Sequence, residues 1–305
     1  MLSMYPLRNL SLQKSKPKYL FAGLGTMGFP MAGHLSKNLD LDLYIFNRTS
    51  SVSDKWIKKY NGTRLVSLNN CSIKFDGVIT CLKDDASLIS VILKSSLLKA
   101  IKTNGFIIDH STTSLDLVLT ISTNQNILDK KISFFDAPIS GGEVGATNGV
   151  LSIMLGGPKK KLLRINNLMD SYAKNIVHIG PSGHGQITKM VNQLCIGSLI
   201  QGLSEGVALG KKSNLNMAKV LDAISGGAAQ SWQMDNRFKT MVNGKFDFGF
   251  AVDLMIKDLK IAINHSKDLG IKLPSTKSVL QNYKKLSALG EGELDTSSLI
   301  KLLES

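Results

Sequence analysis

The chain has 305 residues, of which 43% are hydrophobic and 20% charged, and it carries 37 Lys and Arg against 23 Asp and Glu. This length and composition fit an ordinary folded protein with room for two domains, and they exclude an intrinsically disordered chain. No stretch is apolar for the roughly 18 residues that a membrane span needs. The net charge of +14 favours anionic partners. Because the lysines are scattered without an aromatic platform between them, we expect a small anionic ligand rather than nucleic acid.

Three cysteines, Cys71, Cys81 and Cys195, form no Cys-x-x-Cys pair, which argues against a disulfide framework or a zinc site. The cytoplasm, a reducing compartment, is therefore the expected location. Residues 1–17 are basic and contain no acidic residue, so we expect a tail outside the folded domains. Their composition is also that of a transit peptide, and the mitochondrial matrix is the alternative location. The five histidines show no metal-ligand spacing, so we expect no metal.

The first predicted strand, Tyr19 to Ala22, is followed at once by three glycines and then by a helical pattern to Leu35. In a dinucleotide-binding turn the first glycine permits a tight turn, the second lets the backbone approach the pyrophosphate, and the third lets the helix pack on the strand. A glycine-rich turn without a ligand is the alternative, but the motif lies where the fingerprint requires it. We expect the cofactor to contact Gly23, Leu24, Gly25, Thr26, Met27 and Gly28.

The second predicted strand, residues 41–46, ends about 20 residues beyond the glycines, where NAD-binding proteins place an Asp or Glu on the ribose. This chain has Asn47, Arg48 and Thr49 there instead. An arginine suits a 2′-phosphate, which an acidic side chain would repel. We therefore predict NADP in preference to NAD. The alternative is a surface arginine that happens to follow a strand.

Strands and helices continue to alternate, with a helix at 51–60 and strands at 63–66, 76–80 and 105–109. This alternation predicts a parallel sheet with helices on both faces. Polar clusters follow two of the strands, at residues 81–87 and 109–114. Ligands lie at the carboxyl ends of such strands, so we expect cofactor contacts from Leu82, Lys83, Ser87 and Thr112. The same Ser, Thr and Asp residues could cap helices, and both roles can hold together.

Residues 132–157 predict two strands, one ending near Ala137 and one beginning near Val150, with a glycine-rich loop between them. Bare backbone N–H groups in such a loop can bind an anion. We expect Ser140, Gly141 and Gly142 to bind the substrate. A flexible hairpin connection is the alternative.

Residues 183–212 form a long helical pattern that places Lys189, Asn192 and Gln193 at i, i+3 and i+4, on one face. A solvated lysine on a surface helix is the alternative for Lys189. Only helical patterns follow Lys212. The sequence therefore predicts a Rossmann-type parallel-sheet domain at 18–181, followed at 182–305 by an interdomain helix and an all-helical domain, with the ligand site at their joint.

Four sequence blocks resemble the β-hydroxyacid dehydrogenase family in order and spacing: GLGTMGFPMAGHL at 23–35, FFDAPISGGEVGATNGVLSIMLGG at 134–157, GHGQITKMVNQ at 183–193 and FDFGFAVDLMIKDLKIA at 246–262. That family includes 3-hydroxyisobutyrate dehydrogenase and tartronate semialdehyde reductase. The resemblance implies an NAD(P)-dependent oxidoreductase, a homodimer or homotetramer, in which Lys189 is catalytic. It implies that Ser140, Gly141 and Gly142 hold the substrate carboxylate and that Lys257 contacts the cofactor. The family usually has two asparagines after the lysine, whereas this chain has Asn192 and then Gln193.

Oxidation of an alcohol in a small carboxylate needs a hydride acceptor, a proton acceptor and a group that holds the carboxylate. A lysine has an ordinary pKa of about 10.4, so Lys189 needs burial or a neighbouring cation such as Lys257 to act as a base. We expect Asn192 to orient the reacting oxygen, with Gln193 as a further substrate ligand. Tartronate or succinic semialdehyde is the alternative substrate. A non-catalytic dinucleotide-binding protein is the alternative class, and the retained Lys189 with its Ser-Gly-Gly loop argues against it.

Overall fold

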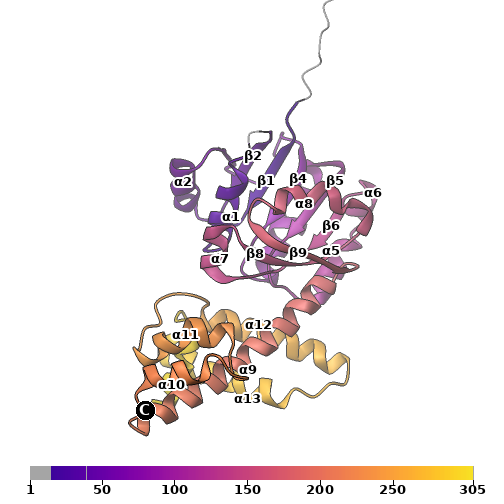
Figure 1. Ribbon diagram of the computed structural model, residues 1–305. Helices are drawn as coiled ribbons and strands as arrows, with labels where there is room; N and C mark the ends of the chain where they lie inside the picture. The colour runs from indigo at the N-terminus through magenta and orange to yellow at the C-terminus, as the bar shows by residue number, and fades with distance from the viewer. Residues whose placement is uncertain (1–14, 39, 305) are drawn as a thin grey trace, which may run out of the picture.

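The computed structural model describes residues 15–38 and 40–304. Residues 1–14 of the expected basic tail, and with them the question of a transit peptide, lie outside the described residues. Figure 1 shows two lobes, a sheet flanked by helices and a bundle of helices, which the long helix α9 (His184–Lys212) connects. Within the described part of the chain, no helix is long and apolar enough to cross a bilayer.

The first lobe is built on one β-sheet. Its described strands are β1 (Lys18–Ala22), β2 (Asp42–Phe46), β3 (Thr63–Arg64), β4 (Phe75–Thr80), β5 (Ile101–Asp109), β6 (Ser133–Asp136), β7 (Ile139–Ser140), β8 (Leu151–Gly156) and β9 (Ala173–Gly180). They are ordered β3-β2-β1-β4-β5-β6-β8-β7, with β9 beside β8. Strands β1 to β6 are all parallel, as the alternation predicts. Their carboxyl ends therefore meet at one edge of the sheet.

The last part of the sheet departs from the prediction of a parallel sheet. Strand β8 is antiparallel to β6 and β7, and parallel to β9. The stretch expected as a loop contains β7 and a helix, α7 (Gly142–Asn148), which has too few apolar residues to show a helical period. Strand β9 was not predicted, because most of its side chains, including those of Val177 and Ile179, are exposed or half-buried.

Helices cover both faces of the sheet, as expected. Side chains alternate along β1, so that Phe21 packs in one hydrophobic cluster with Met31 and Trp56, while Leu20 packs in another with Leu88 and Val118. The described helices of this lobe are α1 (Gly28–Leu35), α2 (Ser50–Lys59), α3 (Asp85–Leu88), the π-helical turn η1 (Ile89–Leu93), α4 (Leu97–Ala100), α5 (Leu115–Ser122), α6 (Gln125–Asp129), α7, the 3-10 turn η2 (Lys159–Lys161) and α8 (Leu162–Met169).

Helix α9 joins the two lobes. Its 29 residues span about 43 Å at 1.5 Å per residue. It begins after Gly183, whose φ of +96° is one that residues with a β-carbon rarely adopt. The helix contacts β6, β8 and β9 in the first lobe and α11, α12 and α13 in the second. Lys189, in its second turn, therefore lies near the joint between the lobes, as predicted.

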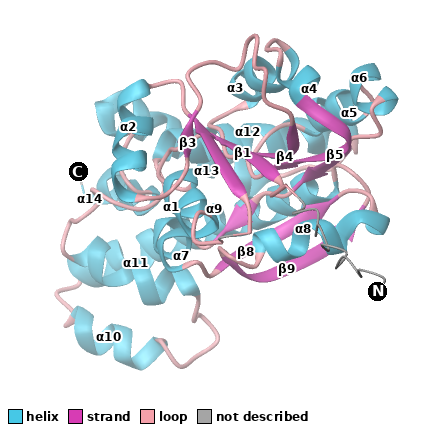
Figure 2. Cartoon of the chain, turned by 90° about the horizontal axis from the view of Figure 1, so that it is seen from above, coloured by secondary structure: helices cyan, strands magenta, loops and turns pink. Residues whose placement is uncertain are grey.

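The second lobe is helical, apart from loops and an isolated β-bridge between Ala251 and Asp295, in the described residues after Gly180 (Figure 2). One hydrophobic cluster fills it, with Met255 and Tyr283 fully buried. Its elements are α10 (Met217–Ile224), α11 (Trp232–Val242), α12 (Val252–Asp268), α13 (Pro274–Leu286), the π-helical turn η3 (Ser287–Glu291), the 3-10 turn η4 (Thr296–Ile300) and α14 (Lys301–Glu304).

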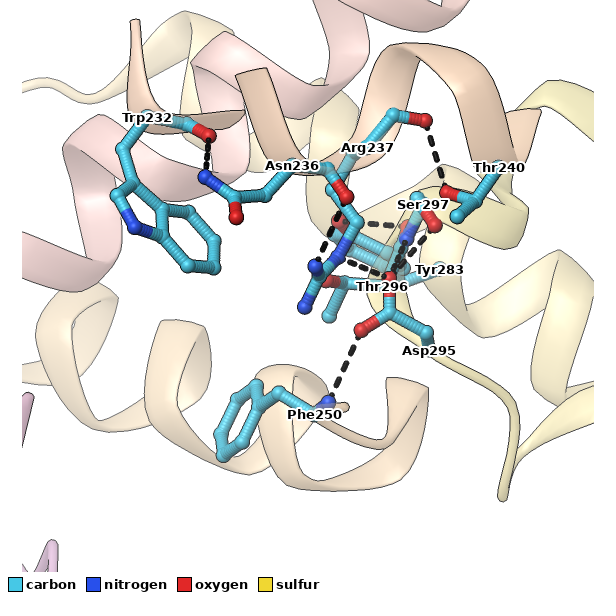
Figure 3. Close-up of polar contacts among 9 residues, drawn as sticks. All are labelled: Trp232, Asn236, Arg237, Thr240, Phe250, Tyr283, Asp295, Thr296 and Ser297. Atoms are coloured by element: carbon cyan, nitrogen blue, oxygen red, sulfur yellow. Dashed lines mark hydrogen bonds and ion pairs between the residues drawn. The ribbon is translucent and has the colours of Figure 1, made fainter. Parts of the chain in front are cut away.

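A buried carboxylate, Asp295, holds this lobe together (Figure 3). Its Oδ1 accepts hydrogen bonds from the Ser297 N–H at 3.0 Å and from Arg237 Nε at 2.9 Å, and its Oδ2 accepts one from the Phe250 N–H at 3.0 Å. The Arg237 guanidinium also lies 5.1 Å from the ring centroid of Trp232. The carboxylate thereby links α11 and η4 to the residues that precede α12.

Candidate active site

The three glycines between β1 and α1 have different surroundings. A Cβ at Gly23 would lie 2.2 Å from the Cys81 carbonyl oxygen, and one at Gly28 would lie 2.0 Å from the Gly23 carbonyl oxygen. Both positions are therefore closed to any side chain by protein packing. A Cβ at Gly25, in contrast, would meet nothing within 4 Å. The second glycine thus leaves open backbone where a dinucleotide phosphate can approach, and the turn fits that group.

The predicted ribose-binding residues lie beside this turn. Asn47 follows β2, and its Oδ1 accepts a hydrogen bond from the Leu24 N–H at 3.0 Å. Its Nδ2 donates to the Thr49 carbonyl at 3.1 Å. Asn47 therefore holds the turn in place, while Arg48 and Thr49 next to it are exposed. The free guanidinium at this edge is the group that could meet a 2′-phosphate.

The polar clusters after β4 and β5 cap helices, which is one of the two roles expected of them. Asp84 accepts a hydrogen bond from the Ser87 N–H at the start of α3, and Ser114 accepts one from the Leu117 N–H at the start of α5. The two clusters also meet, since the Leu82 N–H donates to Ser111 Oγ at 2.9 Å. They border the same edge of the sheet as the glycine turn, where Lys83 is exposed.

Lys257, on α12, reaches the same sheet edge. Its Nζ donates to the Thr112 carbonyl at 2.6 Å and pairs with Asp258 Oδ1 at 2.8 Å. Lys257 of the second lobe and Thr112 of the first, both predicted to contact the cofactor, are thus in contact with each other. A cavity of about 590 Å³ lies between the lobes here, lined by Asp84, Asp85, Lys257 and Lys260 among others. A second cavity, of about 460 Å³, begins at Gly25 and Thr26.

The amine of Lys189 is buried, with only 8% of the residue exposed. Its Nζ donates to the Ile139 carbonyl at 2.9 Å. The pKa of Lys189 is lowered to about 8, first by burial; the Asp258 carboxylate opposes this shift, and the Lys257 charge adds to it. The solvated surface lysine is therefore excluded. An amine with this pKa can exchange a proton near neutral pH.

The two amides after Lys189 take part in one chain of hydrogen bonds. Asn192 Nδ2 donates to Gln193 Oε1 at 2.8 Å, and Gln193 Nε2 donates to Asp258 Oδ2 at 2.7 Å. Gln193 is buried whereas Asn192 is half-buried. Both ends of the Gln193 amide thus contact protein groups, and Asn192 is the more accessible of the two to a ligand.

The Ser140-Gly141-Gly142 stretch directly follows Ile139. Gly141 has φ of +127° and Gly142 φ of +62°, and a Cβ at Gly142 would meet nothing within 4 Å. Ser140 ends β7 and is half-buried, while both glycines are exposed at the start of α7. Exposed backbone therefore lies two and three residues from the carbonyl that holds the Lys189 amine. This arrangement brings a buried amine close to an exposed glycine stretch.

Two buried acids of this region were missed in the sequence. Asp258 contacts Gln193 and Lys257, and Asp136 contacts the start of α9. Both are in the quoted family blocks, but nothing in their local spacing distinguishes them from solvated acids. Among the described residues, no group of three or more His, Cys, Asp and Glu side chains gathers to hold a metal ion. The site therefore offers a dinucleotide turn, a buried amine and an exposed glycine stretch.

Comparisons with known proteins agree with the two-lobed fold. Residues 18–180 match the model of the NAD binding domain of 6-phosphogluconate dehydrogenase, and residues 183–303 match the NAD-binding domain of NADP-dependent 3-hydroxyisobutyrate dehydrogenase. An oxidoreductase of Shewanella frigidimarina is 41% identical over 94% of this chain and 98% of its own. The Arabidopsis thaliana protein named "Probable 3-hydroxyisobutyrate dehydrogenase-like 1, mitochondrial" is 35% identical over 95% of this chain and 86% of its own. Mycobacterium tuberculosis 3-hydroxyisobutyrate dehydrogenase, solved with L-serine, superposes with a TM-score of 0.85 at 25% identity, covering 95% of this chain and 100% of that one.

Proposed function

The chain belongs to the β-hydroxyacid dehydrogenase family, and we propose that its substrate is a small 3-hydroxy acid, or the matching semialdehyde, with Lys189 as general acid and base. As a member of that family it is an NAD(P)-dependent oxidoreductase of hydroxy acids. The observation that best supports the role of Lys189 is its buried amine, whose pKa is lowered to about 8, held by the Ile139 carbonyl next to the Ser-Gly-Gly stretch.

In the oxidation direction, the dinucleotide supplies the acceptor for the hydride that leaves the alcohol carbon. Neutral Lys189 takes the hydroxyl proton as the carbonyl forms, and the amine becomes an ammonium. In reduction the same ammonium returns its proton to the oxygen that becomes the hydroxyl. Ser140, Gly141 and Gly142 hold the carboxylate, and Asn192 orients the reacting oxygen. Gln193 acts mainly through its bonds to Asn192 and Asp258.

The preferred cofactor in this proposal is NADP. Arg48 is exposed beside the dinucleotide turn, and residues 47–49 include no acidic side chain that would repel a phosphate. A charge-assisted contact with the 2′-phosphate contributes about 1.5–3 kcal/mol, which is roughly a 10- to 100-fold preference. Asn47 remains committed to Leu24 and Thr49, so it supports the turn rather than the phosphate.

A panel of C3 and C4 semialdehydes, assayed with NADPH and with NADH, tests the proposal. We expect methylmalonate semialdehyde, the oxidised form of 3-hydroxyisobutyrate, to be reduced with the highest kcat/KM, and NADPH to be preferred by about 10-fold or more. A higher kcat/KM with tartronate or succinic semialdehyde would change the proposed substrate but leave the proposed role of Lys189 unchanged. Binding of NADPH without turnover of any member would favour the non-catalytic alternative.

The matched control for the cofactor preference is Arg48→Ala. It should lower kcat/KM with NADPH by about 10-fold or more and leave the value with NADH nearly unchanged, because only NADPH carries the 2′-phosphate. An equal loss with both cofactors would show that Arg48 does not read the phosphate.

We also propose that the enzyme is a homodimer, with α9 in the interface. Large apolar residues of this helix are exposed, among them Val191, Leu199 and Leu209, and their burial against a second copy would favour association. Sedimentation equilibrium should give a mass near twice the 33.1 kDa of the chain. A monomer at micromolar concentration would contradict the proposal, and Leu199→Glu should weaken the dimer if it is correct.

A further inference from the structure

The first turn of α9 is held by a carboxylate from the sheet. Asp136, the last residue of β6, is fully buried. Its Oδ1 accepts a hydrogen bond from the Gly183 N–H at 2.8 Å, and its Oδ2 accepts one from the Gln186 N–H at 2.9 Å. The first N–H groups of a helix have no partner within the helix, and Gly183 has no side chain that could cap it. A residue distant in the sequence therefore supplies the cap, and its negative charge suits this end of the helix.

Two glycines make room for this carboxylate. A Cβ at Gly156 would lie 2.5 Å from Asp136 Oδ1, and one at Gly185 would lie 2.4 Å from the Asp136 carbonyl oxygen. Strand β8 and α9 thus approach the carboxylate more closely than any other residue type would allow. The position of the helix start relative to β6 is fixed on both sides.

The side chain of Gln186 ties the same turn to the end of β5. Its Oε1 accepts a hydrogen bond from the Thr113 N–H at 3.2 Å, and its Nε2 donates to the Ser111 carbonyl at 2.7 Å. Gln186 is buried. Lys189 follows it by three residues, so it lies on the same side of the helix, one turn further along.

The segment that begins with Asp136 meets α9 a second time. Three residues on, the Ile139 carbonyl accepts the hydrogen bond of Lys189 Nζ, and Ser140, Gly141 and Gly142 follow directly. The short stretch 136–142 therefore contacts the helix start through a carboxylate and the lysine amine through a carbonyl. Any shift of the helix start against β6 would change the distance between the amine and the Ser-Gly-Gly stretch.

We propose that Asp136 is a positioning residue for Lys189, which sets the amine against the substrate-binding stretch by capping α9 from the end of β6. The inference rests on the proposed function of Lys189. It concerns placement and not proton transfer, because the Asp136 oxygens bind backbone N–H groups. A misplacement of about 1 Å can cost roughly 100-fold in rate, so a cap far from the reacting atoms can control kcat.

Asp136→Asn is the test, since it preserves the size of the side chain but directs an amide NH₂ at one of the two backbone N–H groups. We expect kcat to fall by about 10- to 100-fold, while KM for NADPH stays within about twofold because the glycine turn is untouched. The limb of the pH profile that belongs to Lys189 should also move, since the amine would sit in a different environment. A purely structural role would move neither the profile nor kcat at a temperature where the variant is folded.

Two further variants complete the experiment. Asn216→Ala removes the side-chain cap of α10 in the second lobe. It should leave kcat unchanged even if it lowers Tm as much as Asp136→Asn does. Gln186→Met keeps the Asp136 bonds but loses those that tie the same turn to Ser111 and Thr113. It should lower kcat by about 10-fold or more, so the proposal stays testable where Asp136→Asn does not fold, and wild-type kcat in Gln186→Met would then overturn it. Wild-type kcat in folded Asp136→Asn, or an equal loss in Asn216→Ala, overturns the proposal. Failure of the function of Lys189 itself is distinguished by Lys189→Met, which would then remain active.

Discussion

Lys189→Met should lower kcat by about 10²- to 10⁴-fold with every substrate that the wild-type enzyme turns over, which is the usual contribution of a positioned general acid or base. Methionine matches the length of the lysine stem but cannot carry a proton. It loses the hydrogen bond to the Ile139 carbonyl, yet it also removes a buried amine, so the fold should remain. Steady-state kinetics in both directions measure the effect, and KM for NADPH should change little because the Lys189 amine contacts the Ile139 carbonyl rather than the glycine turn.

The pH profile of the wild-type enzyme provides the control. Oxidation needs the neutral amine, so its kcat should rise with pH and level off above the Lys189 pKa of about 8. Reduction needs the ammonium, so its kcat should be highest below that pKa and fall above it. Lys189→Arg keeps the charge but holds its proton at all accessible pH values, and it should lose both activities together with the limb near 8. Near-wild-type kcat in Lys189→Met would contradict the mechanism.

The features that the sequence predicts best are those with local signals. Gly23, Gly25 and Gly28 lie directly between a buried strand and a helix, and the structure shows that the first and third are required by packing. The polar clusters at 81–87 and 109–114 are expected to cap helices, to border the cofactor, or both, and Asp84 and Ser114 within them do cap α3 and α5. The face shared by Lys189 and the two amides also follows from spacing alone.

The features that the sequence does not predict depend on contacts between distant residues. Asp258 stands beside Lys257 in an amphipathic helix, a pattern typical of a solvated surface, and its burial is set by Gln193, 65 residues away. Asp136 likewise meets α9 about 50 residues later. The lowered pKa of Lys189 comes first from burial, which no spacing reveals. Helix α7 is also hidden in the sequence. It is short, it lies between two glycines with positive φ, Gly141 and Gly149, and its apolar residues do not repeat at helical spacing.

Gly25→Ala should raise KM and Kd for NADPH by about 10- to 100-fold while leaving the stability of the free protein almost unchanged. The new methyl group would meet no protein atom within 4 Å, so the fold can accept it. It would, however, stand where the pyrophosphate must approach the backbone, and a lost charge-assisted hydrogen bond costs about 1.5–3 kcal/mol. Thermal unfolding with and without NADPH measures the stability and the Kd, because a ligand that binds only the native state raises Tm by an amount that grows with the logarithm of its concentration over Kd.

Gly28→Ala is the matched variant that separates cofactor contact from packing. Its Cβ would lie 2.0 Å from the Gly23 carbonyl oxygen and 3.2 Å from the ring of Phe21, so α1 would have to move away from β1, and Tm of the free protein should fall. The two substitutions should therefore have opposite effects. Gly25→Ala should lose affinity for NADPH while the free protein stays stable, and Gly28→Ala should lower the stability of the free protein. If Gly25→Ala bound NADPH as tightly as the wild type, the phosphates would have to lie elsewhere than on this turn, and the cofactor assignment of residues 23–28 would be wrong.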